Sequence, residues 1–201
     1  MNKKSVTRVL NCHQEEGIIN WKLNVGKTKA KKISEDALRI GTKVDLLVQD
    51  DINNGKYDIT ECEPQVVNAM RGWEKFKTKY PEYVDGVEDM QVELIMDDIV
   101  GHPDIRTVSN IDDIKTGNRL IVRPKYVVQV CRYAVSAGKS KAGIIILSKT
   151  RTEGAFLYIQ FEGQAINYFG CIVFDAFCIV YEYEFTVRNM VRNYLEKEKL
   201  E

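Results

Sequence analysis

Residues 101–115 read GHPDIRTVSNIDDIK, and this stretch decides which fold we expect. Two strand-like runs, 99–107 and 108–115, follow one another, so Asp104 and Asp113 are expected on adjacent strands. Side chains two residues apart on a strand share a face, which places Lys115 beside Asp113. The stretch therefore predicts two carboxylates and one ammonium group at one place on a sheet.

Such a group of side chains has a definite chemical use. Two carboxylates can bind one hard cation such as Mg2+, and the carbonyl oxygen of Ile114 is a further hard ligand. The ammonium group of Lys115 can hold a water molecule or neutralise charge on a phosphorane-like transition state. The alternative is a surface hairpin with ordinary salt bridges, because short motifs often match by chance in a chain with 29 Asp and Glu residues.

The sequence before this stretch predicts helices followed by a strand. Residues 1–33 combine a short patterned segment with a lysine-rich loop. Apolar residues at helical spacing indicate a helix that follows Ser34, its N-cap, and ends at Asn53-Asn54-Gly55, and a second helix at 64–80. From Gln91 the period changes to that of a strand, which carries Glu93 and begins a three-strand meander.

The sequence after it predicts a helix, two strands and a closing helix. A short strand at 119–122 is followed by a helix at 124–137, on which Lys125, Gln129 and Tyr133 share one face. Buried strands are expected at 143–148 and 155–161. The tail from 164 to 198 is amphipathic and ends in a charged helix. With no linker and no repeat, residues 1–201 are expected to form one α/β domain.

The charges are balanced overall but unevenly distributed. Lys plus Arg and Asp plus Glu each number 29, which argues against a protein that coats polyanions non-specifically. Between Asp113 and Glu153 there is no acidic residue. That window holds nine basic residues: Lys115, Arg119, Arg123, Lys125, Arg132, Lys139, Lys141, Lys149 and Arg151. It suits a phosphate-binding surface beside a carboxylate site, although a solvated face of a neutral protein is the alternative.

Other features of the sequence exclude several classes of protein. No run approaches the roughly 18 apolar residues of a membrane span, and no signal-peptide core follows the basic N-terminus. We therefore expect a cytoplasmic protein, of bacterial or phage-infected host cytosol, that binds no membrane. The five scattered cysteines indicate buried thiols. Aromatic residues of the tail could stack on bases, but their spacing favours a core: Phe174, Phe177, Tyr181, Tyr183 and Phe185.

Five features in this order resemble the RecB-like branch of the PD-(D/E)xK nucleases, including mitochondrial genome maintenance exonucleases and their phage relatives. They are Gly41-Thr42-Lys43-Val44-Asp45, Glu93, Gly101-His102-Pro103-Asp104, Asp113-Ile114-Lys115 and Gln129-Val130-Cys131-Arg132-Tyr133. The opening Ser5-Val6-Thr7-Arg8-Val9-Leu10 and Trp21 also look like the start of those exonucleases.

The resemblance implies a fold and an activity. The fold is a restriction-endonuclease-like α/β/α core, a central mixed sheet flanked by helices, with a long C-terminal helix. The activity is Mg2+- or Mn2+-dependent hydrolysis of DNA phosphodiester bonds, more often from a free end than internally.

The resemblance also implies roles for individual residues. Asp104 and Asp113 would hold the metal ion together with the Ile114 carbonyl, with Glu93 and Asp45 in the site. Lys115 would orient or activate water, while Gln129 and Tyr133 position the DNA strand. The acid-free window adds further residues expected to contact DNA: Lys125, Arg132, Lys139 and Lys141.

The sequence departs from the family pattern at two points. Asp45 stands where the family usually has His, which leaves one or two metal ions possible. The four-cysteine pattern of relatives with an iron–sulfur cluster is absent, so we expect no cluster. His102 is a further candidate ligand or substrate contact, or a residue that merely fills a strand end.

A second function is compatible with the same residues. The chain could be a DNA-binding module of this fold that has lost cleavage and works within a recombination or repair complex. A homo-oligomer or a recombination partner protein is also possible. Strand preference, polarity and pathway are not encoded in any feature of the sequence.

Overall fold

The structure is a computed structural model that describes residues 4–12, 16–96 and 99–198. Its helices are α1 (Val6–Leu10), α2 (Glu16–Val25), α3 (Lys27–Asn54), α4 (Pro64–Lys79), α5 (Pro81–Asp85), α6 (Pro124–Ala137), α7 (Gln164–Asn167), the π-helix η1 (Tyr168–Val173) and α8 (Phe174–Glu198). Its strands are β1 (Lys4–Ser5), β2 (Val87–Met90), β3 (Leu94–Met96), β4 (Ile99–Gly101), β5 (Ile105–Thr107), β6 (Asn110–Gly117), β7 (Lys141–Ser148) and β8 (Phe156–Glu162).

Two mixed sheets form the framework. The larger sheet has the order β2-β5-β6-β7-β8, in which β6 and β7 are parallel and the other pairs are antiparallel. The smaller sheet has the order β1-β4-β3, with β1 parallel to β4. All but the first residue of β7 are buried, because β7 is a central strand covered by helices on both faces.

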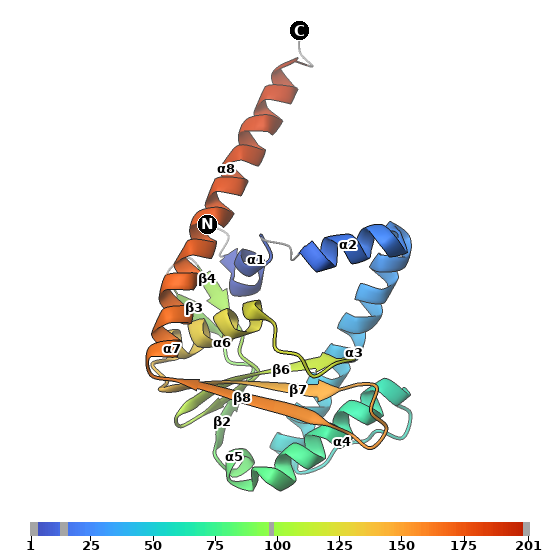
Figure 1. The fold of residues 1–201 in the computed structure, drawn as a ribbon. Coiled ribbons are helices and arrows are strands. Elements are labelled where there is room, and N and C mark those ends of the chain that lie inside the picture. The colour runs from blue at the N-terminus through green and yellow to red at the C-terminus, as the bar shows by residue number, and fades with distance from the viewer. Residues whose placement is uncertain (1–3, 13–15, 97–98, 199–201) are drawn as a thin grey trace.

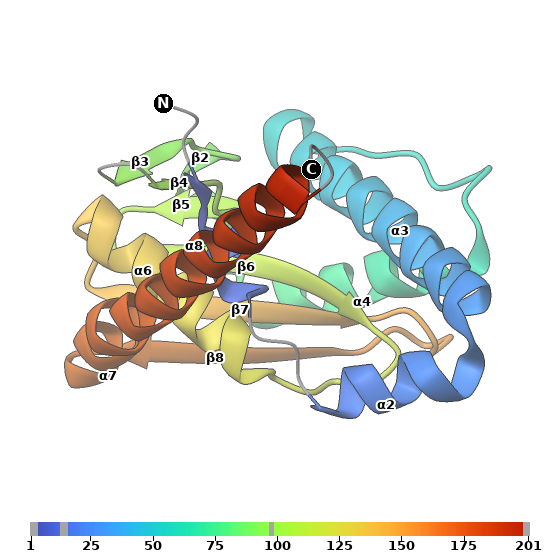
Figure 2. The same ribbon diagram turned by 90° about the horizontal axis from the view of Figure 1, so that it is seen from above.

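Helices cover both faces of the larger sheet, as Figures 1 and 2 show. On one face α3 and α4 pack against β5, β6 and β7 through a core around Trp73, Phe76 and Ile145. On the other face α1, α6 and the start of α8 form a second core, which includes Ile144 and Phe174. The expected α/β/α arrangement with a central mixed sheet and a long C-terminal helix is therefore confirmed.

The predicted helices with clear end signals are confirmed. Helix α6 begins at Pro124, where the missing N–H costs nothing, and ends before Gly138, whose φ of 63° is left-handed. Helix α4 likewise begins at Pro64. The predicted strands 143–148 and 155–161 correspond to β7 and β8.

Four predictions at the level of single elements were wrong. The lysine-rich segment is part of α3, which begins at Lys27, because Lys and Ala are good helix formers. Ser34 is therefore no N-cap; its hydroxyl donates to the Ala30 carbonyl inside the helix. The run 99–107 is two strands of different sheets, so residues 91–115 form no simple meander, and residues 119–122 are outside any strand.

The C-terminal helix differs most from expectation. Phe174 is buried, but Tyr183 and Phe185 are 70% and 53% exposed, because α8 runs away from the body of the molecule (Figure 1).

The prediction that no segment is long and apolar enough to span a membrane was also wrong. Gln164–Val191 is helical and has a mean hydropathy of 1.4 in an 18-residue window. Ile166, Gly170 and Phe174 of this segment are nevertheless buried in the core.

Candidate active site

The candidate site is centred on β6, which places Asp113 and Lys115 on one face. The Lys115 ammonium forms an ion pair with Oδ2 of Asp113, whose side chain is only 2% exposed. Burial alone would lower the pKa of Lys115, but Asp113 and Asp104 outweigh it and the pKa is raised. Lys115 is therefore a fixed cation beside buried carboxylates.

Asp104 lies in the connection between β4 and β5 and reaches the same part of β6. Its Oδ2 accepts a hydrogen bond of 2.6 Å from the backbone N–H of Ile114, the residue between Asp113 and Lys115. Its Oδ1 accepts from the Gln91 amide at 2.9 Å. Strand β5 begins only at Ile105, so the backbone pairing between β5 and β6 ends there. The side chain of Asp104 therefore accepts a hydrogen bond from a backbone N–H of β6 that would otherwise lack a partner.

Helix α3 brings Asp45 toward these groups. A Cβ at Gly41 would lie 3.6 Å from the Thr116 hydroxyl oxygen, so this part of α3 passes close to the end of β6. Burial, opposed by the charge of Lys115 and aided by that of Asp113, raises the pKa of Asp45 to about 6. The structure thus brings Asp45 within electrostatic range of the predicted pair.

Burial also raises the pKa of Asp104 well above its usual range, and the charges of Asp113 and Asp45 add to this rise. Three carboxylates accordingly lie within range of one lysine. Such an excess of negative charge in a buried place favours a bound cation or protons on the carboxyl groups.

Helix α6 carries Gln129 and Tyr133. Both are buried, and the Gln129 amide donates to the Tyr133 hydroxyl at 2.9 Å. Burial and the charge of Asp113 raise the pKa of Tyr133 to about 12. A Cβ at Gly101 would collide with the ring of Tyr133, so glycine is what lets β4 approach α6 here.

Three other predicted residues are used differently. The exposed Glu93 pairs with His102 across 3.5 Å, and no contact between Glu93 and Asp104 or Asp113 is found among the described residues. Lys125 donates to Asn11 of the α1 end at 3.4 Å. Arg132 lies on another face of α6, where its guanidinium sits 5.0 Å from the ring centroid of Phe174.

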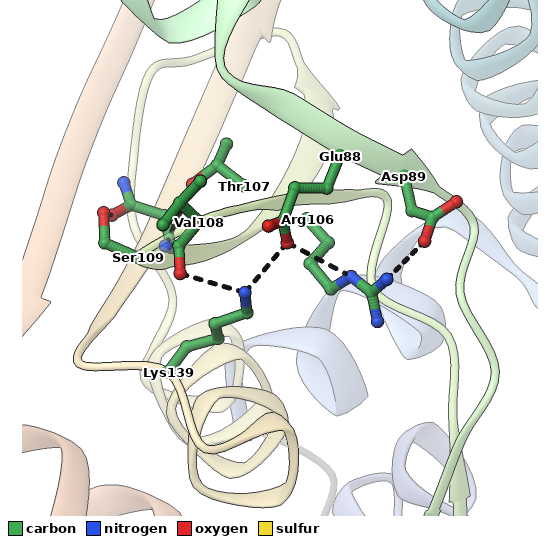
Figure 3. Close-up of polar contacts among 8 residues, drawn as sticks. Glu88, Asp89, Arg106, Thr107, Val108, Ser109 and Lys139 are labelled. Atoms are coloured by element: carbon green, nitrogen blue, oxygen red, sulfur yellow. Dashed lines mark hydrogen bonds and ion pairs between the residues drawn. The ribbon is translucent and has the colours of Figure 1, made fainter.

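Lys139 and Lys141 lie at the opposite end of the sheet from Lys115. Lys141 pairs with Asn110, the first residue of β6, whereas Lys115 pairs with Ile146 near the end of β7. The Lys139 ammonium donates to Glu88 and to the Val108 carbonyl, both at 2.9 Å (Figure 3). Lys139 is thus engaged in joining α6 to the β2–β5 pair.

The donor set fits a hard divalent cation with few protein ligands. Within the described residues, no three His, Cys, Asp or Glu side chains lie close enough together to hold a metal ion. Mg2+ commonly uses one or two carboxylates and completes its shell with water and substrate phosphate. Asp104 and Asp113 meet that requirement, with Oδ2 of Asp113 already paired with the Lys115 ammonium.

Two residues near the site were not predicted. Gln91 has a left-handed φ of 54° and binds Asp104 through both its amide side chain and its backbone N–H. The buried Asp112 accepts from the Tyr158 hydroxyl at 3.2 Å, and burial raises its pKa to about 7. A Cβ at Gly143 of β7 would collide with Asp112. Asp112 could have been noticed in the sequence because it is adjacent to Asp113. No sequence pattern indicated a role for Gln91.

Comparison with known proteins gives structural neighbours only. No family model matches the chain, and no curated protein matches it. Among solved structures, the chain is similar to the alkaline exonuclease LHK-Exo from Laribacter hongkongensis, with 14% identity, a TM-score of 0.45 and coverage of 96% of this chain and 95% of the other.

Two further solved structures match over a smaller share of both chains. SSO0001 matches with 12% identity, a TM-score of 0.43 and coverage of 83% and 72%. A phage related exonuclease from Haemophilus somnus 129PT matches with 11% identity, a TM-score of 0.41 and coverage of 73% and 82%.

Proposed function

We propose that the protein is a divalent-metal-dependent deoxyribonuclease whose reaction takes place at Asp104, Asp113 and Lys115. The observation that carries this proposal is the hydrogen bond from the Ile114 amide to Asp104, because it fixes the second carboxylate next to the Asp113–Lys115 pair. Carboxylates and lysine in such a group are suited to phosphodiester hydrolysis.

Each residue has a definite part in this proposal. Asp104 and Asp113 would hold Mg2+ or Mn2+, and the bound ion would polarise the scissile phosphate and acidify its water. Lys115, held against Asp113, would place its positive charge where negative charge develops on the phosphate. Asp45 would adjust the charge of the site from α3, and Gln129 with Tyr133 would hold the strand from α6.

The expected substrate is DNA, with cleavage from a free end more often than internally. Support comes from the sequence between Asp113 and Glu153, which has no acidic residue and includes Lys115 and Lys125. A second candidate is a DNA-binding module without cleavage. It is favoured by the lack of a third close metal-binding side chain within the described residues.

One experiment separates these candidates. End-labelled linear DNA and internally labelled circular DNA, each single- and double-stranded, are incubated with the protein in Mg2+, in Mn2+ and in EDTA. An exonuclease releases label from linear DNA only, an endonuclease also cuts the circles, and a binding module shifts the DNA without cutting it. Lack of both cutting and binding under all conditions would refute the proposal.

A further inference from the structure

A cavity of about 450 Å3 lies between α1 and α8. Thr7, Arg8 and Asn11 line it from the N-terminal segment, and Tyr181, Phe185 and Arg188 line it from α8. Its volume is within the roughly 300–1,000 Å3 of small-ligand sites. The two walls come from opposite ends of the sequence, so the cavity exists only because α8 packs along α1.

The lining combines cations with aromatic rings. The Arg8 guanidinium carbon lies 6.0 Å from the ring centroid of Tyr181, and Phe185 is 53% exposed toward solvent. Sites for single-stranded nucleic acid are built in this way, with cations for the phosphates and rings on which bases stack. Asn11 and Thr7 add polar groups that can bind a sugar or a base edge.

One carboxylate, Glu184, also lines the cavity and limits where a phosphate can lie. Glu184 binds Arg188 at 3.0 Å, so these two side chains largely cancel each other's charge. The net positive charge is therefore on the Arg8 side. A phosphate is expected beside Arg8, and a base beside Phe185.

The cavity is connected to the candidate site by hydrogen bonds. The Thr7 hydroxyl lies on the cavity wall and accepts from the Gln129 amide at 3.4 Å. The same amide donates to Tyr133, which lies within electrostatic range of Asp113 and Lys115. A strand bound in the cavity would thus continue toward the carboxylates along α6.

We propose that this cavity binds one nucleotide of a single-stranded DNA segment, next to the phosphate that is cleaved. The proposal rests on the deoxyribonuclease function and adds the form of its substrate: a strand whose base is unpaired at this position. The base must be unpaired because a base inside a duplex is stacked between its neighbours and cannot stack on Phe185.

The test measures binding of a fluorescein-labelled oligothymidylate by anisotropy in EDTA, where no metal-dependent cleavage occurs. Arg8→Gln is expected to weaken binding about 5-fold or more and to lower the log–log salt slope by about 0.7, one phosphate contact. Phe185→Ala is expected to weaken binding about 5- to 100-fold without changing that slope, because a base–ring contact is lost.

The matched control is Tyr183→Ala, which removes an aromatic side chain of the same helix that is 70% exposed and does not line the cavity. It should bind like the parent. Isotherms of Arg8→Gln and Phe185→Ala that superimpose on the parent's would overturn the proposed nucleotide site. If the parent still cleaves DNA in Mg2+, the deoxyribonuclease proposal survives that result. A parent that neither binds nor cleaves DNA refutes both.

Discussion

The carboxylate of Asp104 accepts a 2.6 Å hydrogen bond from the backbone N–H of Ile114. This bond joins the connection between β4 and β5 to the strand that carries Asp113 and Lys115. It leaves Oδ1 of Asp104 bound to Gln91 alone among the hydrogen bonds described. The backbone N–H of Ile114 and the amide of Gln91 together hold Asp104 in place, so its charge can be changed with little change of shape.

Asp104→Asn tests this separation of charge from shape. Burial and neighbouring carboxylates raise the pKa of Asp104, which means that the folded protein disfavours its charged form. The amide oxygen can keep the bond from the Ile114 N–H, and its NH2 can donate to the Gln91 side chain once the Gln91 amide turns over. The variant should therefore unfold in urea close to the parent. Cleavage should fall about 10^2-fold because a metal ligand is weakened. Parental activity in this variant would exclude Asp104 as a ligand.

Asp113→Ala and Lys115→Met should each reduce cleavage by about 10^2-fold or more, because each removes charge that acts on the phosphate. They should differ in metal binding. Mn2+ titration by calorimetry should show weaker binding for Asp113→Ala, whereas Lys115→Met should bind at least as well as the parent, since a competing cation is gone.

The control for this pair is binding of DNA in EDTA, which should persist in both variants. Unchanged turnover in either one would remove the assignment of the reaction to β6. Circular dichroism spectra that match the parent's are needed before loss of activity is attributed to chemistry.

The sequence predicted the parts of this site that follow from local spacing. Asp113 and Lys115 share a face because a strand alternates, and Gln129 and Tyr133 share one because a helix repeats every 3.6 residues. Helix α6 was predicted to the residue because Pro124 and Gly138 mark its ends.

Contacts between distant segments could not be predicted in the same way. Gln91 binds Asp104 from a left-handed turn that no residue type requires, and Gly101 makes room for the Tyr133 ring on another element. The split of 99–107 into two strands likewise depends on pairing partners far along the chain. The exposed positions of Tyr183 and Phe185 follow from where α8 leaves the core.

Asp45→Asn tests the residue that differs from the family pattern. If Asp45 acts on the metal ion, directly or through its charge, the amide should raise the Mg2+ concentration needed for half-maximal cleavage. Asp45→His should restore part of the activity, more with Mn2+ than with Mg2+. Superimposable metal titrations for the parent and Asp45→Asn would exclude Asp45 from acting on the ion.

The last prediction concerns two lysines with different expected roles: Lys125 near the start of α6 and Lys139 just after its end. Lys139 binds Glu88 and the Val108 carbonyl, and Arg106 joins Glu88 to Asp89 (Figure 3). Lys139→Met should therefore lower the free energy of unfolding, by less than about 1 kcal/mol for partly exposed pairs, and leave the salt dependence of DNA binding unchanged.

Lys125, near the start of α6 and beside Asn11 of the cavity wall, is the matched comparison. Lys125→Met should lower the log–log salt slope by about 0.7 on single-stranded DNA and leave urea unfolding nearly unchanged. Anisotropy titrations at several salt concentrations measure both slopes. A lower slope for Lys139→Met with an unchanged slope for Lys125→Met would place the DNA at the start of β6 and β7, away from Asp113 and Lys115, and would contradict the path proposed along α6.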